Sequence, residues 1–159
     1  MKANTDCSLG RHDKSLNLYN ETIRILRQHH ILPKKRLGQN FVVDDSLLQT
    51  MVSCADVGPK DIVLEVGAGL GFLTRLLSSK AKRVMAVEID HRLIPILKEQ
   101  LPHLHNAALI EGDILTVSIP RFDKVVSTPP YSISSPLLFW LLEKSFKLAV
   151  LVFQEEFAA

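Results

Sequence analysis

The rhythm of hydrophobic and polar positions changes once along this chain of 159 residues. Up to about residue 56, apolar residues recur three to four positions apart, as on one face of a helix. This spacing predicts two helices, over residues 16–29 and 45–56, and Asp44 is a suitable N-cap for the second. Residues 1 to about 15 are polar, and we expect them to be loosely held.

From residue 61 onward, short apolar runs alternate with helix-compatible segments. Strands are predicted over residues 61–66, 84–89, 107–110, 124–126 and 148–153. Helices are predicted over residues 72–79, 92–101 and 136–145. Strands that alternate with helices are typical of a parallel α/β sheet, in which ligands bind at the carboxyl ends of the strands. The residues that follow each strand are therefore the first candidates for a functional site.

A glycine-rich turn follows the first predicted strand. It reads Glu65-Val66-Gly67-Ala68-Gly69-Leu70-Gly71, and its glycines allow a sharp bend and a close approach to a ligand. Dinucleotide-binding enzymes use a similar turn, but their G-x-G-x-x-G spacing is one residue longer at the end. A carboxylate beside the turn disfavours a pyrophosphate and suits a cationic ligand.

Acidic residues follow the second and third strands. Glu88 ends the second strand, where a carboxylate can accept hydrogen bonds from both hydroxyls of a ribose. Asp113 follows the third strand and can accept a hydrogen bond from an adenine amine, although an aspartate is equally common in ordinary turns.

The fourth strand runs into the segment STPPYSISSP, residues 127–136. Two adjacent prolines fix φ near −65° and donate no backbone hydrogen bond, so they form a stiff elbow. The elbow carries the hydroxyl of Thr128 before the prolines and the ring of Tyr131 after them. Four strand ends together offer a ligand turn, a ribose acceptor, a base acceptor and an aromatic ring.

Composition limits the class of protein. Hydrophobic residues make up 47% and charged residues 23%, which is typical of a folded domain, and the net charge is +2. The stretch from Arg24 to Arg36 is basic and contains no acid, so it is either a phosphate-binding patch or a solvated helix end. Two cysteines without metal-ligand spacing indicate an intracellular protein with reduced thiols and no metal site. With no apolar run of ~18–20 residues, no membrane span is predicted. We expect a cytoplasmic protein, or a nucleolar or organellar one in a eukaryote.

These residues resemble a known family. The sequence is similar to the class I S-adenosylmethionine-dependent methyltransferases, and more narrowly to the ribosomal RNA adenine dimethyltransferases, relatives of the erythromycin-resistance enzymes. The resemblance covers about residues 22–159, and it favours the archaeal and eukaryotic branch. Its motifs are PKKRLGQNFVVD (33–44), VLEVGAGLGFLT (63–74), AVEID (86–90), EGD (111–113), VVSTPPYSISSP (125–136) and VFQEEFA (152–158). The stretch KKRLGQNF is the most discriminating of these, because generic methyltransferases lack it.

The resemblance implies a Rossmann-like, mostly parallel sheet that binds S-adenosylmethionine and methylates the exocyclic amine of adenines in small-subunit ribosomal RNA. It divides the chain into an N-terminal extension with one helix, 1–33, and a methyltransferase domain, 34–159. The implied cofactor-binding residues are Gln39, Asn40, Val42, Gly67, Gly69, Gly71, Glu88, Ile89, Asp113, Ile114 and Thr128.

Roles toward the RNA also follow from the resemblance. Tyr131 would stack on the target adenine, and Phe157 would cover its other face. Lys34, Lys35 and Arg36 would meet RNA phosphate. The expected partner is ribosomal RNA or a precursor of the small ribosomal subunit, bound by a monomer without metal or membrane.

Two features depart from the family pattern. The family places asparagine or aspartate where this chain has Thr128, next to the proline-loop carbonyl at Pro129, and both positions would contact the target amine. Threonine is shorter and stiff at χ1, so we expect weakened or abolished transfer with cofactor binding largely kept. The resemblance also stops after the fifth strand, so we expect a truncated domain without the last two strands and the C-terminal helical domain.

Other functions stay open at this point. The chain could bind cofactor and RNA with little catalysis and act in ribosome assembly, which Thr128 favours. It could methylate another amine, in DNA adenine or a glutamine side chain, although the GQNF segment argues against this. A nicotinamide-dependent oxidoreductase is disfavoured by the glycine spacing and by Glu65.

Overall fold

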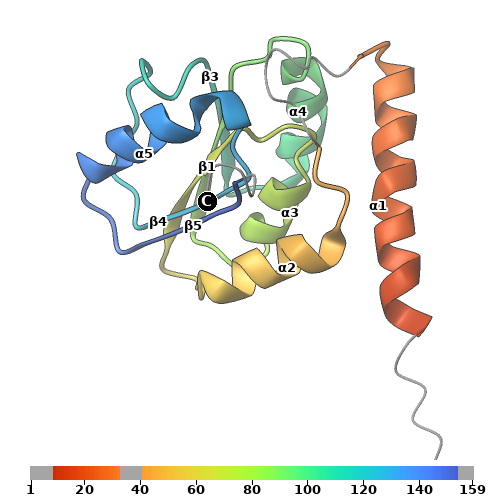
Figure 1. Ribbon diagram of the computed structural model, residues 1–159, viewed down its shortest axis with the longest axis horizontal. Coiled ribbons are helices and arrows are strands. Elements are labelled where there is room, and N and C mark those ends of the chain that lie inside the picture. The colour runs from red at the N-terminus through yellow and green to blue at the C-terminus, as the bar shows by residue number, and fades with distance from the viewer. Residues whose placement is uncertain (1–8, 33–40, 154–159) are drawn as a thin grey trace, which may run out of the picture.

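Five parallel strands form the centre of the protein. The computed structural model describes residues 9–32 and 41–153 (Figure 1). The strands are β1 (Ile62–Val66), β2 (Arg83–Glu88), β3 (Ala107–Glu111), β4 (Lys124–Ser127) and β5 (Leu148–Leu151). They pair in the order β3-β2-β1-β4-β5, every pair parallel. The predicted Rossmann-like α/β sheet is confirmed.

Helices cover both faces of the sheet. They are α1 (Leu9–Gln28), α2 (Asp45–Cys54), α3 (Phe72–Ser78), α4 (Ile94–Gln100) and α5 (Ser134–Leu142), with short 3-10 turns η2 (Leu101–His103) and η3 (Tyr131–Ile133). Figure 1 shows α5 on one side of the sheet and α2, α3 and α4 on the other, with α1 outermost beside them. Asp44 caps α2 as predicted, because its side chain accepts hydrogen bonds from the amides of Ser46 and Leu47.

The alternation of side chains along each strand sends neighbouring residues to opposite faces. In β1, Val63 packs in the cluster that joins α1, α2 and α3, whereas Leu64 packs in the cluster that contains Leu137 and Leu141 of α5. Both faces of the central strands are therefore buried, which explains why these strands read as nearly continuous apolar runs. Glu65 is the one polar residue of β1. Its side chain lies on the same face of the sheet as Val63, toward α3.

The first helix is longer than its apolar pattern indicates. The pattern predicts a start at residue 16, whereas α1 begins at Leu9. Extending an existing helix fixes one residue for each hydrogen bond gained, so polar residues can join the helix without burying a face. Leu18, Ile25 and Leu26 of α1 are buried in the same cluster as α2 and α3. The proposed division at residue 33 stays a prediction.

Asn106 joins two connections at the amino end of the sheet. Its side-chain amide donates to the carbonyls of Ser78 (2.9 Å) and Ala81 (2.8 Å), and its carbonyl oxygen accepts from the Ser78 hydroxyl. Replacing Asn106 with alanine leaves these groups without their partners, so we expect the free energy of unfolding to fall by about 2–3 kcal/mol. Urea denaturation measures this, with Asn20→Ala on the exposed side of α1 as the control. A loss no larger than that of the control would contradict the prediction.

Candidate active site

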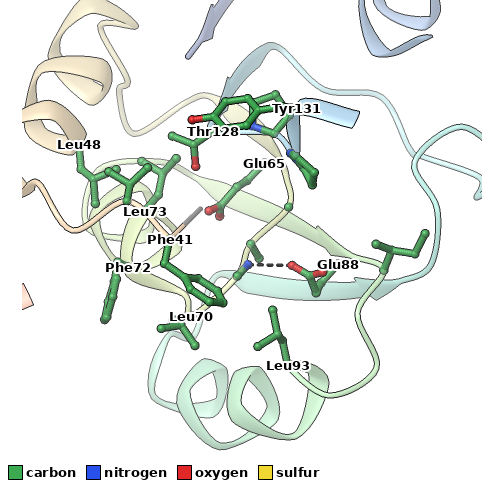
Figure 2. A pocket seen from close by; sticks show the side chains of 17 residues that line it. Phe41, Leu48, Glu65, Leu70, Phe72, Leu73, Glu88, Leu93, Thr128 and Tyr131 are labelled. Atoms are coloured by element: carbon green, nitrogen blue, oxygen red, sulfur yellow. Dashed lines mark hydrogen bonds between the residues drawn. The ribbon is translucent and has the colours of Figure 1, made fainter. Parts of the chain in front are cut away.

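A cleft of about 770 Å³ opens at the carboxyl ends of β1, β2 and β4. Figure 2 shows Thr128 and Tyr131 on one rim, Glu65 and Glu88 between the walls, and Phe41 and Leu93 across from the rim. The lining residues are Phe41, Val42, Leu48, Glu65, Gly67, Ala68, Gly69, Leu70, Phe72, Leu73, Glu88, Ile89, Leu93, Thr128, Pro129, Pro130 and Tyr131. The cleft therefore lies where the strand pattern predicts a ligand, and its walls are apolar and aromatic.

The glycine turn after β1 has a backbone that only glycine adopts easily. Gly67, Gly69 and Gly71 have φ of 79°, 59° and 79°. Gly71 is the N-cap of α3, and the amide of Gly69 donates to Glu88. A Cβ at Gly67 would lie 2.9 Å from Cδ of Pro130. The turn is thus in direct contact with the proline elbow that follows β4.

Glu88 holds the turn in place from the end of β2. Its Oε2 accepts from the Gly69 amide at 2.8 Å, and its Oε1 accepts from the Asp90 amide at 2.8 Å. The residue is only 4% exposed, and burial raises the pKa of its carboxyl group. Glu88 lines the cleft at the position predicted for a ribose acceptor.

Glu65 is the second acidic group of the cleft, and it differs from the sequence expectation of a carboxylate. The residue is 1% exposed, and burial raises the pKa of Glu65 to about 8, with a smaller contribution from the charge of Glu88. The Thr74 hydroxyl donates to Glu65 Oε2 at 2.6 Å, which acts in the opposite direction. At neutral pH the side chain is therefore mostly a carboxylic acid.

This raised pKa gives a prediction for stability against pH. Between pH 4.5, the ordinary pKa of a glutamate, and about pH 8, the folded state holds a proton on Glu65 that the unfolded state has lost. The free energy of unfolding therefore falls as pH rises through this window. We expect the free energy of unfolding of the Glu65→Gln variant, whose side chain cannot ionise, to fall less steeply over this pH range. Urea denaturation of both proteins from pH 5 to pH 9 measures the difference, and parallel curves would contradict the raised pKa.

A second cavity of about 440 Å³ adjoins the cleft at the ends of β2 and β3. Asp113, Ile114 and Ile89 line it, together with Ser132 from the elbow. Ile89 also lines the first cleft, as do Gly67 and Pro130, so the two spaces share a wall. Oδ1 of Asp113 accepts from the Leu115 amide at 2.9 Å, which fixes this carboxyl group at the end of β3.

The loop after β4 is braced at both ends. The Ser127 hydroxyl donates to the carbonyl of Val66 and accepts from its amide, which locks the ends of β1 and β4 together. After the prolines, the carbonyl of Tyr131 accepts from the Ser134 hydroxyl at 2.9 Å. Thr128, Pro129 and Tyr131 are held between these braces, and all three line the cleft.

Nearly all predicted site residues that the structure describes come together here. The glycine turn, Glu88, Ile89, Val42 and the elbow lie in the first cleft, except that Gly71 borders α3 beside it, whereas Asp113 and Ile114 lie in the second cavity. Their roles stay predictions. Six predicted residues lie outside the described ranges: Lys34, Lys35, Arg36, Gln39, Asn40 and Phe157.

Sequence reasoning missed most of the apolar wall. Leu48, Leu73 and Leu93 read as helix core residues, and they do belong to the core, but they also line the cleft. Phe41 could have been found, because it follows the two polar residues of the GQNF segment. Trp140 lies outside the site, because its ring packs on Phe122 with 6.3 Å between centroids.

Residues 9–32 and 41–153 contain neither a metal-binding cluster nor a membrane-spanning helix. No group of three or more histidine, cysteine, aspartate or glutamate side chains is arranged there to hold a metal ion. No helix in the same residues is long and apolar enough to cross a bilayer.

The sheet order and the position of the cleft define the class. This is the Rossmann-like fold of the class I methyltransferases, and solved structures share it. The chain is 36% identical to the crystal structure of the 23S rRNA methyltransferase ErmE, with a TM-score of 0.69 over 75% of this chain and 50% of that one. It is 40% identical to a dimethyladenosine transferase from Plasmodium falciparum, with a TM-score of 0.66 over 72% of this chain and 43% of that one.

The family follows from the sequence comparisons. The family model described as ribosomal RNA adenine dimethylase matches residues 32–159. A probable ribosomal RNA small subunit methyltransferase A from Methanosarcina barkeri is 44% identical over 137 residues, which are 86% of this chain and 48% of the relative. The chain belongs to the ribosomal RNA adenine dimethylase family. It spans about half the length of the curated relatives that it matches.

Proposed function

We propose that the chain binds S-adenosylmethionine and transfers its methyl group to the exocyclic amine of an adenine in small-subunit ribosomal RNA. One observation supports this most directly. The carboxyl group of Glu88 lines the cleft beside the mostly protonated side chain of Glu65, and no lysine, arginine or histidine lines it among the described residues. Such a cleft favours a cationic ligand and disfavours a pyrophosphate, which nicotinamide and flavin dinucleotides carry.

The residues present fit this cofactor. The glycine turn brings backbone close to the ligand, beside the carboxyl group of Glu65, where the methionine part would lie. Glu88 would take the ribose hydroxyls, and Asp113 would take the adenine amine in the second cavity, between the side chains of Ile89 and Ile114. When bound, the cofactor supplies an activated methyl group on a sulfonium.

The chain's own contribution is positioning and hydrogen bonding. The elbow would hold an adenine against the cleft, with the Tyr131 ring stacked on the base, which offsets part of the cost of unstacking, ~1–3 kcal/mol for each base. The carbonyl of Pro129 and the hydroxyl of Thr128 would accept hydrogen bonds from the amine, so that charge developing on nitrogen is stabilised. Holding donor and acceptor in line lowers the entropic part of the barrier.

Thr128 supports a second candidate function. It lines the rim of the cleft, at the position where the family carries an asparagine or aspartate, and its side chain is shorter. A chain that binds cofactor and ribosomal RNA but transfers methyl groups slowly would act as a ribosome-assembly protein. The two candidates share the binding site and differ in the rate of transfer.

The RNA partner and setting complete the proposal. Relatives are named for the small subunit and, in ErmE, for 23S rRNA, so the choice of RNA needs its own test. We propose the small-subunit RNA or its precursor, bound by a monomer with Lys34, Lys35 and Arg36 on phosphate. The reaction would occur in the cytoplasm, or in the nucleolus or an organelle of a eukaryote.

Calorimetric titration of the purified chain tests the cofactor. We expect micromolar binding of S-adenosylmethionine and no binding of NAD⁺. The reverse result, or binding of neither, would contradict the proposal. Incubation with labelled cofactor and fragments of small- or large-subunit RNA, followed by digestion to nucleosides, then tests the substrate. Label in N6-methylated adenosine from the small-subunit fragment is the expected product, and label elsewhere would reassign the acceptor.

A further inference from the structure

Arg92 lies just beyond the cleft and makes contacts that its sequence position does not suggest. It follows β2 and precedes α4 in the loop that also carries Asp90. Its guanidinium donates from Nε to Asp90 Oδ1 at 3.0 Å and from Nη2 to Asp90 Oδ2 at 2.6 Å, a two-pronged ion pair. The Asp90 side chain is only 1% exposed, so this pair is largely shielded from water. Shielded pairs of this geometry are stronger and more specific than surface pairs.

Hydrogen bonds connect this ion pair to Glu88 in the cleft. The Asp90 amide donates to Glu88 Oε1, and Glu88 Oε2 accepts from the Gly69 amide, both at 2.8 Å. Glu88 and Asp90 are acids two residues apart. Burial raises the pKa of Glu88, and the charge of Asp90 makes a smaller contribution in the same direction. Arg92 supplies a positive charge directly on Asp90. Arg92 is therefore linked to the carboxyl group of Glu88 through Asp90.

Arg92 also reaches a distant part of the chain. Its Nη1 donates to the carbonyl of Leu32 at 2.9 Å, whereas the Leu32 side chain is 79% exposed and packs little. Phe41 lines the cleft and lies beside Gly69, 3.7 Å from where a Cβ on that glycine would be. The same network thus contacts the Leu32 carbonyl at one end and, through Gly69, the Phe41 ring at the other.

We propose that Arg92 is a positioning residue for this reaction. Through Asp90 it fixes the carboxylate of Glu88 against the glycine turn, and through Leu32 it fixes where the N-terminal part of the chain meets the cofactor site. The assignment of Glu88 to the cofactor ribose rests on the proposed function, whereas the positioning itself is a property of the ligand-free protein.

A purely structural role predicts something different. Removing a structural ion pair lowers global stability and speeds exchange of the most protected amides throughout the sheet. Removing a positioning residue first weakens the hydrogen bonds of the network that it holds, before global stability changes. The amides of Gly69 and Asp90 both donate to Glu88, so their hydrogen exchange reports the position of this carboxylate without any ligand.

The experiment compares Arg92→Gln, Arg92→Lys and a control, Lys98→Gln. Lys98 is a cation on the adjacent helix α4 that pairs with Glu111 at 2.6 Å, but both side chains are more than half exposed. Two measurements are made on each protein: hydrogen exchange of the Gly69 and Asp90 amides relative to amides of β1, and calorimetric affinity for S-adenosylmethionine.

For Arg92→Gln we expect exchange at Gly69 and Asp90 to speed up about tenfold or more with β1 unchanged, and cofactor affinity to fall by a similar factor. Arg92→Lys restores a charge near Asp90 but cannot bridge Asp90 and Leu32 with a planar fork, so its effects should be intermediate. Lys98→Gln should change neither measurement.

Two results would overturn the inference. One is unchanged or uniformly faster exchange in both Arg92 variants, and the other is full cofactor affinity in Arg92→Gln. Should the unaltered chain bind no S-adenosylmethionine while Gly69 and Asp90 still respond to Arg92, the positioning role stands and the proposed function fails. The exchange measurement on Arg92→Lys keeps the test decisive if Arg92→Gln does not fold.

Discussion

Replacing Thr128 with asparagine should raise the rate of methyl transfer by about 10²–10³-fold. A missing hydrogen-bond acceptor in a transition state typically costs ~2.7–4 kcal/mol, and this is the cost that an asparagine would recover. Thr128 lines the rim of the cleft between two braced positions, so the backbone can present a longer side chain without moving. The asparagine oxygen extends one atom further toward the amine than the threonine hydroxyl.

The measurement is single-turnover transfer of labelled methyl to an RNA that contains the target adenine. Affinity for S-adenosylmethionine should be largely kept, because asparagine is also polar at this position and the change acts mainly on the amine. Thr50→Asn, on the exposed side of α2, is the control for the substitution itself. Equal rates for Thr128→Asn and the unaltered chain would show that the threonine is not the limiting residue. The assembly-protein alternative would then lose its main support.

Glu88→Gln should weaken binding of S-adenosylmethionine by about 100-fold or more. The carboxylate would accept two ribose hydroxyls, and hydrogen bonds to a charged group contribute ~1.5–3 kcal/mol each. It already accepts the amides of Gly69 and Asp90, one on each oxygen. A glutamine has one acceptor and one NH₂ group, so its NH₂ would face one of these two N–H donors. The substitution therefore removes the ribose contacts and disturbs the glycine turn together.

A matched control lies on the neighbouring strand. Glu111 of β3 pairs in register with Glu88 and is likewise the last residue of its strand, but it is exposed and pairs with Lys98. Calorimetric titration of Glu111→Gln should give the affinity of the unaltered chain. If Glu88→Gln binds within about threefold of that value, Glu88 does not hold the ribose.

The sequence allowed the sheet to be predicted because its central strands are buried on both faces. The runs in β1 and β2 are short, mostly apolar and bounded by turn residues. Nearly continuous apolar runs of this kind are typical of parallel strands, which are covered on both faces. Helix ends were predicted less well. The start of α1 lacks an apolar stripe, and α5 begins at Ser134, two residues before the predicted start, because Pro136 is tolerated within a first turn.

The polar residues of the site could be predicted from their positions after strands, whereas their protonation states and backbone contacts could not. Glycines and acids after strands can be read from sequence, since the topology brings those positions together. The protonated state of Glu65 cannot be read this way, because it depends on complete burial behind Thr74. The role of Arg92 depends on a carbonyl, that of Leu32, 60 residues away in the chain. Contacts to backbone atoms leave no pattern of residue types.

The contact between Gly67 and Pro130 sets a dimension of the proposed reaction. A Cβ at residue 67 would lie 2.9 Å from the proline ring, closer than carbon atoms tolerate, so a larger residue there would push the two loops apart. One of these loops would carry the methyl donor and the other the methyl acceptor. Glycine at this position therefore allows the closest approach of the two loops. An in-line displacement needs its reacting atoms about 3–3.5 Å apart, and the absence of a side chain at residue 67 would let the two loops bring donor and acceptor to that distance.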